Sequence, residues 1–139
     1  MSLDLHFFKK GTNFQGIRES ISVLYEKKRT IDSEIEQLEN DYDYAKLTSL
    51  NITHNLNKMA MEAGIYEVLW YPETIGITSA FQMIQPLESG LRKLKSNPEK
   101  YKSFNPSNGW GKYEDLVNFC ESALYWCREY PDAIIEASA

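Results

Sequence analysis

Between residues 17 and 45 the apolar positions recur at alternating intervals of four and three residues. The repeating positions are Ile17, Ile21, Leu24, Lys28, Ile31, Ile35, Leu38, Tyr42 and Ala45. This spacing is a heptad repeat, which is typical of a helix that pairs with another helix along one seam. Lys28 is the only position of the series with a charged side chain, and neither Gly nor Pro occurs from Arg18 to Ala63. The pattern predicts one long coiled-coil helix over residues 12–48, with the repeating positions as its oligomerisation surface.

A helix of this length extends for about 50 Å, at about 1.5 Å per residue. A domain of this size is too small to cover all of it, so part of the apolar surface must meet another molecule. The alternative is a helical hairpin within one chain that turns near Thr30.

The charges of this segment are unevenly distributed along it. A basic patch, Lys27 to Arg29, is followed by acidic residues with no Lys or Arg among them. These are Asp32, Glu34, Glu36, Glu39, Asp41 and Asp43. Two parallel copies would set the acidic stretches side by side, whereas an antiparallel pair offsets them against Arg18 and the basic patch. We therefore expect an antiparallel homodimer.

The rest of the chain reads as a compact helical part with short strands at its two ends. Leu3, Leu5 and Phe7 alternate with other residues, which is typical of a strand with one buried face, and Ala133–Glu136 is a second short strand-like run. We expect these two to pair in a small β ribbon that joins the termini. The predicted fold is mainly α: a single domain over residues 1–139, with the long helix inserted after the first strand and a compact helical part over residues 49–139.

The amino-acid composition makes some classes of binding partner less favourable than others. Hydrophobic residues make up 42% of the chain and charged residues 25%, as in an ordinary globular domain, and the net charge is −5. An excess of acidic residues disfavours binding to a nucleic-acid backbone, which requires clustered Lys and Arg. The first residues lack the features of a signal peptide, and no run of about eighteen apolar residues occurs. We expect a cytoplasmic protein that contacts neither membrane nor nucleic acid.

Two polar clusters are candidates for a ligand site. The first contains Asn51, Thr53, His54, Asn55 and Asn57 at the entrance of a predicted helix, where exposed backbone amides attract anions. The second is Asn108-Gly109-Trp110-Gly111 with Tyr113, where glycines permit close approach and Trp110 offers a stacking surface. Together they predict a pocket for a small polar or nucleotide-like ligand. The alternative is that the first cluster caps a helix and the second is a tight turn held by a core Trp.

The sequence contains no pattern that predicts catalysis or a cofactor. The two histidines, His6 and His54, are far apart, and Cys120 and Cys127 lack nearby ligands, so no metal site is expected. The two cysteines are seven residues apart in a predicted helix, which places their Cα atoms roughly 10 Å apart, too far for a disulfide. We expect both to be buried, no catalytic residues and no cofactor.

The stretch Asn51–Ala60, the segments Ala63–Tyr66 and Leu69-Trp70, the Asn108–Gly111 motif and the closing Tyr130–Ala133 together resemble a group of small uncharacterised proteins encoded by phages and bacteria. The resemblance covers residues 1–8 and 51–139. It implies a phage-encoded protein that acts in the host cytoplasm, and it brings no known reaction. Residues 9–50 depart from the group as an insertion.

Two functions from different classes follow from these patterns. The first is a non-catalytic, self-associating interaction protein that inhibits or sequesters a host or defence component, with the acidic residues of the long helix contacting the target. The second is a small-molecule or nucleotide-binding domain, including a hydrolytic one, that uses the two polar clusters. The long helix also permits a structural role in virion assembly.

Overall fold

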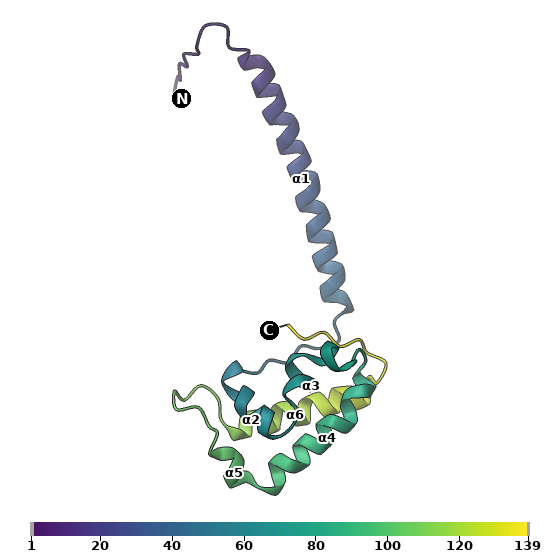
Figure 1. The fold of residues 1–139 in the computed structure, drawn as a ribbon. Coiled ribbons are helices and arrows are strands. Elements are labelled where there is room, and N and C mark those ends of the chain that lie inside the picture. The colour runs from purple at the N-terminus through teal and green to yellow at the C-terminus, as the bar shows by residue number, and fades with distance from the viewer. Residues whose placement is uncertain (1, 139) are drawn as a thin grey trace. The chain divides into compact units, whose positions relative to one another are not determined.

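A computed structural model describes residues 2–138 of the chain, which divides after Ser49 into two compact units. The first unit contains one long helix, α1 (Phe14–Ala45), and the second contains the other helices (Figure 1). The helical segments of the second unit are η1 (His54–Leu56), α2 (Asn57–Glu62), α3 (Tyr66–Trp70), η2 (Pro72–Ile75), α4 (Ala80–Ser96), α5 (Pro98–Lys102) and α6 (Tyr113–Glu129).

The helix α1 is continuous over 32 residues. It begins after Asn13, whose side-chain oxygen accepts a hydrogen bond from the backbone amide of Gly16 at 3.0 Å. Such a cap satisfies one of the amides that have no acceptor within the helix. It ends at Ala45, and at the next residue, Lys46, the backbone turns to the extended conformation. The prediction of a long helix is confirmed, and because the backbone remains helical through Thr30, the hairpin alternative is wrong.

The second unit is built around α4 and α6, which pack side by side. The two helices are antiparallel. The hydroxyl of Tyr113, at the start of α6, donates to the carbonyl of Leu94, near the end of α4, at 2.8 Å. At the opposite end Arg128 forms an ion pair with Glu88 at 2.6 Å. The largest fully enclosed side chains of the core are Leu56, Met59, Ile65, Leu87, Leu94, Leu116, Pro72 and Cys120.

Gly90 is a point of close contact between α4 and the residue that precedes α3. A Cβ added at Gly90 would collide with Cγ2 of Ile65, a side chain that is only 1% exposed. We expect Gly90→Ala to lower the free energy of unfolding by about 1–2 kcal/mol, because overpacking costs about 1–3 kcal/mol and outweighs the gain in helix propensity. Thermal denaturation followed by circular dichroism measures this effect as a loss of several degrees in Tm.

The control for this prediction is Gln85→Ala at an exposed position of the same helix. It leaves Tm close to that of the parent chain. A Gly90→Ala variant with an unchanged or higher Tm contradicts the packing role of the glycine.

The predicted β ribbon is wrong, because no strand occurs within residues 2–138. The segment after α6 instead pairs with the start of α4 through a single antiparallel bridge between Ser79 and Ile134. The amide of Ala80 donates to the carbonyl of Ala133, and that of Phe81 to the carbonyl of Pro131, both at 2.9 Å. The first amides of a helix lack partners within it. The closing segment therefore caps α4 rather than forming a ribbon.

The other half of the predicted ribbon belongs to the first unit and remains exposed. Leu3 is 84% exposed, Leu5 is 72% and Phe7 is 93%. Alternation of apolar and polar residues indicates that a segment can form a strand. It does not indicate whether another segment lies close enough to pair with that strand.

In the part of the chain that the structure describes, no helix is both long enough and apolar enough for a bilayer crossing.

Candidate functional site

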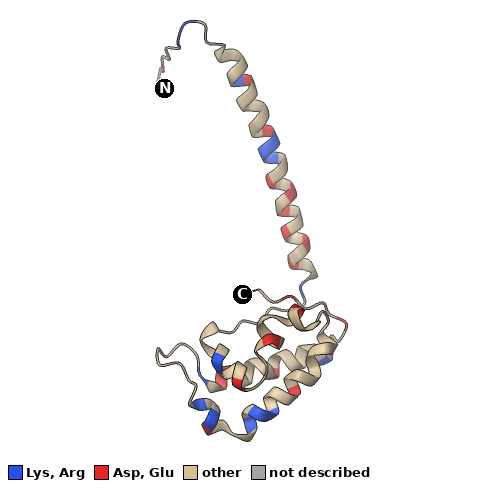
Figure 2. Cartoon of the chain, in the orientation of Figure 1, with Lys and Arg blue, Asp and Glu red and all other residues tan. Residues whose placement is uncertain are grey.

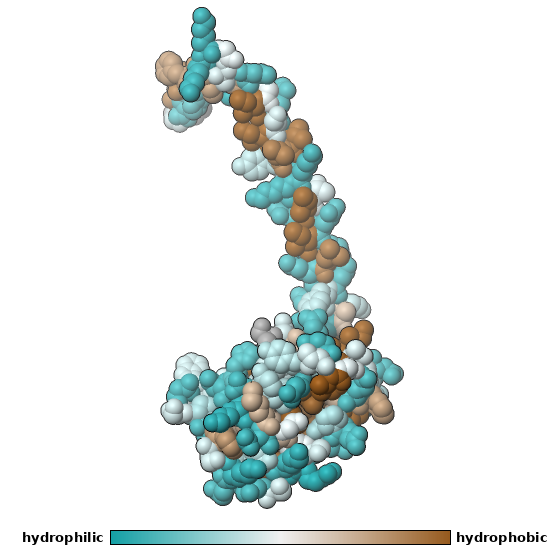
Figure 3. Space-filling view, viewed as in Figure 1, coloured by the Kyte–Doolittle hydropathy of each residue, from teal (hydrophilic) through white to brown (hydrophobic). Residues whose placement is uncertain are grey.

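The first candidate surface is the apolar seam of α1, which we define as the repeating positions Ile17, Ile21, Leu24, Lys28, Ile31, Ile35, Leu38 and Tyr42. No residue of α1 is buried, and the apolar members of the seam are 48–67% exposed. Figure 3 shows hydrophobic side chains recurring along the length of this helix. The core residues, by contrast, all lie in the second unit.

An exposed seam of this length is a physical anomaly for a helix that remains single. Most of the stability of a protein helix comes from packing of its apolar face, and an isolated helix gains little from propensity alone. Full burial of one Ile or Leu side chain contributes about 1.5–3 kcal/mol relative to exposure. The seam therefore offers a large gain in free energy to any helix that covers it.

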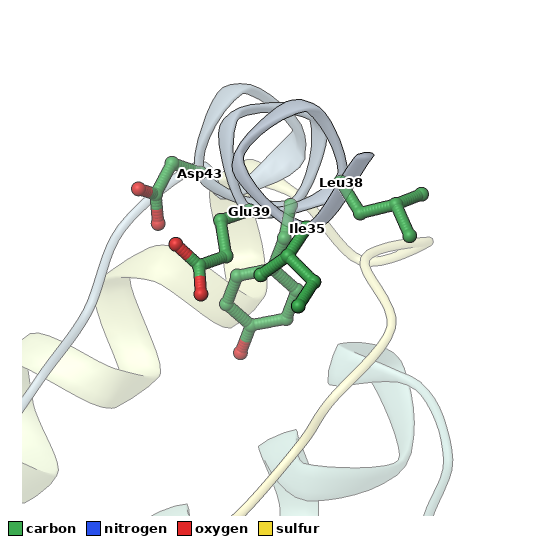
Figure 4. Close-up of a pocket in the computed structure, with 5 residues that line it drawn as sticks. Ile35, Leu38, Glu39 and Asp43 are labelled. Atoms are coloured by element: carbon green, nitrogen blue, oxygen red, sulfur yellow. The ribbon is translucent and has the colours of Figure 1, made fainter. Parts of the chain in front are cut away.

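The C-terminal half of the seam contains a shallow hollow, which is drawn in Figure 4. It is lined by Ile35, Leu38, Glu39, Tyr42 and Asp43, and the first four follow one another at intervals of three, one and three residues. In a coiled coil, each side chain of the seam enters a hole formed by four residues of the facing helix at this spacing. Four of the five lining residues thus have the spacing of such a hole, and two of the five, Glu39 and Asp43, carry carboxylates.

Charges flank the seam on both sides, and in Figure 2 most of the acidic residues of α1 lie in its second half, beyond a basic patch, whereas Glu19 and Glu26 precede that patch. Some polar side chains are satisfied within the helix: Glu26 pairs with Arg29, and Gln37 donates to Asp41 at 3.0 Å. Lys27 and Glu34 form no salt bridge with any residue among 2–138. They border the seam and face the position that a second helix would occupy.

The second candidate surface is a groove in the second unit with a volume of about 500 Å³. One wall comes from the segment Leu50–Thr53, a second from the loop Gly109–Gly111, and a third from α6. The structure thus brings Asn51, Thr53 and Trp110 from the two predicted clusters together. Trp110 is 72% exposed, so it is available as a contact surface rather than held in the core.

Gly111 explains why the two loops can approach each other. Its φ of +102° is rarely adopted by L-amino acids with side chains, and a Cβ there would lie 2.7 Å from Cγ2 of Thr53 and 3.1 Å from Cγ of Leu56. The next loop glycine, Gly109, has a φ of +75°. Between them the backbone amide of Trp110 donates to the side-chain oxygen of Asn108 at 2.9 Å. The loop conformation depends on both glycines.

The other residues of the predicted pocket do not line this groove. His54 accepts a hydrogen bond at Nδ1 from Nε1 of the buried Trp70, at 2.7 Å, which gives the imidazole a structural role. Tyr113 is 8% exposed and its hydroxyl is bound to the Leu94 carbonyl, so it is a core residue. Asn55 is exposed and its backbone amide donates to the Thr53 hydroxyl, while Asn57 begins α2.

The third wall of the groove was missed by the sequence prediction. It consists of Asp115, Asn118, Phe119 and Ser122 on α6. These residues are spaced by three, one and three positions, so they share one face of a helix, next to the apolar face that enters the core. Helical spacing alone therefore places these four residues on one face of α6. The sequence does not indicate that two loops pack against that face.

The two cysteines of α6 are buried, as predicted, and form no disulfide. Burial raises the pKa of the Cys120 thiol to about 12, with a smaller contribution from the charge of Glu121. Burial also raises the pKa of the Cys127 thiol. Because the thiolate is the reactive form, both side chains are held in the unreactive state at neutral pH.

We expect neither cysteine to react with a thiol reagent such as dithionitrobenzoate in the folded protein at pH 8. A raised pKa keeps the thiol protonated until the pH approaches that value, so the expected result is no release of chromophore before denaturant is added. Ser33→Cys, at an exposed position of α1, is the positive control and reacts within minutes. Rapid modification of Cys120 in the folded parent chain contradicts the prediction.

Within residues 2–138, no group of His, Cys, Asp and Glu side chains is arranged to hold a metal ion. Comparison of the chain with protein-family models, curated proteins and solved structures finds no match. The candidate surfaces therefore rest on their own geometry.

Proposed function

We propose that this protein is a non-catalytic interaction protein that self-associates through α1 as an antiparallel homodimer. The observation that carries the proposal is the continuous 32-residue helix whose apolar seam is exposed along its whole length. A heptad pattern sustained over about four repeats is the pattern of a pairing helix. The uneven charge favours the antiparallel orientation, because the acidic half of one helix then lies beside the basic residues of the other.

The non-catalytic part of the proposal is supported by the roles of the most reactive side chains. The His54 imidazole is bound to Trp70, and the thiols of Cys120 and Cys127 are enclosed in the core with raised pKa values. Both thiols are thus held in the unreactive protonated form, and Nδ1 of His54 already accepts a hydrogen bond from the Trp70 indole. In this proposal the protein acts by occupying a surface of another protein.

The proposed target is a basic protein that meets the acidic residues of α1. The net charge of −5 and the acidic half of the helix support this choice, because complementary charge steers association. The resemblance to phage-encoded proteins makes a host or defence component the expected target, which the dimer inhibits or sequesters.

Self-association is tested by sedimentation equilibrium over a range of micromolar concentrations. The expected result is a mass twice that of one chain, with helical content at 222 nm that falls on dilution as the pair separates, because α1 loses the packing that stabilises it. A chain that remains a monomer throughout this range contradicts the proposal.

A second candidate function is the binding of a small polar ligand in the groove, favoured by the exposed Trp110 beside the polar side chains of Asn51 and Asn118. A ligand present at a hundred times its Kd stabilises the folded protein by about 2.7 kcal/mol. A thermal-shift screen with nucleotides and sugars therefore reveals it as a rise in Tm that Trp110→Ala abolishes. Tyr125→Ala, at an exposed aromatic of α6, is the matched control. No rise with any compound rejects this function.

A further inference from the structure

We infer that two copies of α1 pair in one specific antiparallel register, in which Lys28 of one copy lies opposite Ile31 of the other and ion pairs between the copies fix the alignment. This inference rests on the proposed self-association and names the partner surface residue by residue. It also separates the acidic side chains used by the pair from those left for a third protein.

The heptad frame follows from the spacing of the seam. Ile21, Lys28, Ile35 and Tyr42 occupy the a positions, and the d positions are Ile17, Leu24, Ile31, Leu38 and Ala45. In an antiparallel pair, each a residue faces a d residue of the other helix. Alignment of Lys28 with Ile31 overlaps the two helices along their whole length. The resulting layers are Phe14 with Ala45, Ile21 with Leu38, Lys28 with Ile31, Ile35 with Leu24, and Tyr42 with Ile17.

The sizes of the facing side chains agree with this register. Phe14, at the a position before the seam, meets Ala45, the smallest side chain at any a or d position of the helix. Phe14 is 42% exposed in the single chain, where its ring stacks on that of Phe8 at 4.8 Å. Alternation of large and small side chains across an interface is what close packing requires. Lys28 can bury its aliphatic stem against Ile31 while its ammonium group reaches water.

The preformed hollow of α1 has a specific occupant in this register. Ile21 of the second copy lies opposite Leu38, at the centre of the hole formed by Ile35, Leu38, Glu39 and Tyr42. A branched aliphatic side chain is the kind of knob that such a hole accepts. The hole and its occupant come from opposite halves of the same sequence, so one chain supplies both parts of the contact.

The flanking charges decide between this register and its competitors. Across an antiparallel pair, residues at g positions face g positions and those at e positions face e positions. Lys27 then faces Glu34, and Arg18 faces Glu39. Because the dimer is symmetric about a two-fold axis, each ion pair occurs twice. No two charges of the same sign face each other. Lys27 and Glu34 form no salt bridge among residues 2–138 of the single chain, so both are available for these contacts.

Parallel pairing is less favourable by the same reasoning. In register, it brings Glu34 against Glu39 of the other copy on both sides and places Lys28 against Lys28 in the seam. It gains the pair of Lys27 with Asp32, but its other attractive contact, between Asp41 and Lys46, uses a residue outside the helix.

Antiparallel registers shifted by one heptad are also less favourable. A shift in one direction sets Asp32 against Asp32 and Glu34 against Glu34 at the two-fold axis. A shift in the other direction sets Lys27 against Lys27. Each shift also leaves one end of the seam uncovered, with Ile17 lost in the first case and Tyr42 in the second. The full-length register alone combines complete overlap with attractive charge pairs and no repulsive ones.

This register divides the acidic run of α1 into two functional sets. Glu34 and Glu39 form the ion pairs of the dimer, and Asp32 and Asp41 flank the interface. Glu36 lies at a b position, on the outside of the pair, where a basic partner can reach it, whereas Asp43, also at a b position, borders the hollow that Ile21 of the second copy enters. Both are exposed in the single chain. The surface for a third protein is therefore narrower than the acidic run as a whole.

Disulfide trapping tests orientation and register together. Chains carrying Ile21→Cys are mixed with chains carrying Leu38→Cys in a glutathione redox buffer, and the products are mapped by peptide analysis. The expected product is a heterodimer linked between positions 21 and 38, with little of either homodimer. Cys120 and Cys127 are buried, and the parent chain under the same conditions is the control for any reaction they undergo.

The alternative outcomes of this experiment are distinct. Homodimers linked between identical positions indicate parallel pairing and overturn the inference. A dimer by sedimentation that forms no link between positions 21 and 38 retains the proposed function but overturns the register. A monomer by sedimentation removes the proposed function itself.

Charge exchange tests the ion pairs independently. One variant carries Arg18→Glu and Lys27→Glu, and the other carries Glu34→Lys and Glu39→Lys. Each variant alone is expected to associate at least tenfold more weakly than the parent, whereas their mixture regains tight association, because every attractive pair is restored between unlike chains. Two variants that self-associate as tightly as the parent overturn the role of these pairs.

The matched control for the charge exchange is the outward-facing pair Glu19→Lys and Glu36→Lys, at exposed f and b positions. These changes alter the net charge by the same amount as the exchange at Glu34 and Glu39 but lie outside the interface. The expected result is association within about twofold of the parent. A loss as large as that of the interface variants shows that overall charge, not register, controls the pairing, and overturns the inference.

Discussion

Ile35→Asp weakens the self-association of this protein at least a hundredfold in Kd. The side chain occupies the middle of the seam and one wall of the hollow on α1. Its replacement removes an apolar contact worth about 1.5–3 kcal/mol when buried and places a charge where it loses water on pairing. Because the change occurs in both copies, the effects add. Sedimentation equilibrium measures the change in Kd directly.

The matched control for Ile35→Asp is Ser33→Asp, which adds the same charge to the same helix. Ser33 is exposed and lies at an f position, on the side of α1 opposite the seam. It leaves Kd within a few-fold of the parent. Equal weakening by both variants indicates that added negative charge, rather than loss of the seam, separates the copies, and contradicts the role of Ile35.

Leu116→Ala destabilises the second unit by about 2–5 kcal/mol. Leu116 lies in α6, is fully buried and belongs to the core that α4 and α6 build. Removal of a buried Leu side chain costs its transfer free energy and leaves a cavity that the neighbouring side chains fill only in part. A domain has only about 5–15 kcal/mol of stability, so this is a large fraction. Urea denaturation followed by Trp fluorescence gives the loss as a lower midpoint.

The control for the core prediction is Met61→Ala, in α2, where the side chain is 51% exposed. We expect it to change the free energy of unfolding by less than about 1 kcal/mol, since surface substitutions away from special features usually have small effects. Leu116→Ala leaves the seam of α1 unaltered, so we expect the Kd of self-association to stay close to that of the parent. If Leu116→Ala unfolds at the same urea concentration as the parent, Leu116 does not contribute to the core between α4 and α6.

The two expected effects concern different parts of the molecule, and the sequence predicted these parts unequally. The long helix was predictable because the heptad spacing is a local property: each seam residue falls on the same face whatever the rest of the chain does. The burial of Cys120 and Cys127 was predictable for the same reason, since a spacing of seven residues places both on one face of a helix.

The errors lie where the answer depended on distant backbone. Alternation at Leu3, Leu5 and Phe7 indicated a strand, but a strand needs a neighbour. The carbonyl of Ala133 instead accepts from Ala80, the first residue of α4, and the amide of Ile135 donates to Thr78, just before that helix. The free amides at the start of a helix compete for the same carbonyl groups as a strand does. The spacing of apolar residues within one segment cannot predict which of these two donors binds the carbonyl groups.

The candidate groove shows the same division. The sequence identified two loops by their residue types, and it chose Asn51, Thr53 and Trp110 among those that meet. It also included His54 and Tyr113, whose polar atoms bind to Trp70 and to Leu94 instead. A polar residue near a candidate site looks the same in sequence whether its hydrogen bonds face a ligand or the core.

What the sequence by itself determined about this protein is its helical content, the heptad seam and the distribution of charge along α1. These are properties of residues close together in the chain, so the spacing along one helix suffices to fix them. Only the tertiary structure decided that α1 lies outside the core with its seam exposed, that Gly111 lets two loops meet at α6, and that the closing segment caps α4. Each of these depends on which distant groups come within contact distance, and packing of the whole chain sets those distances.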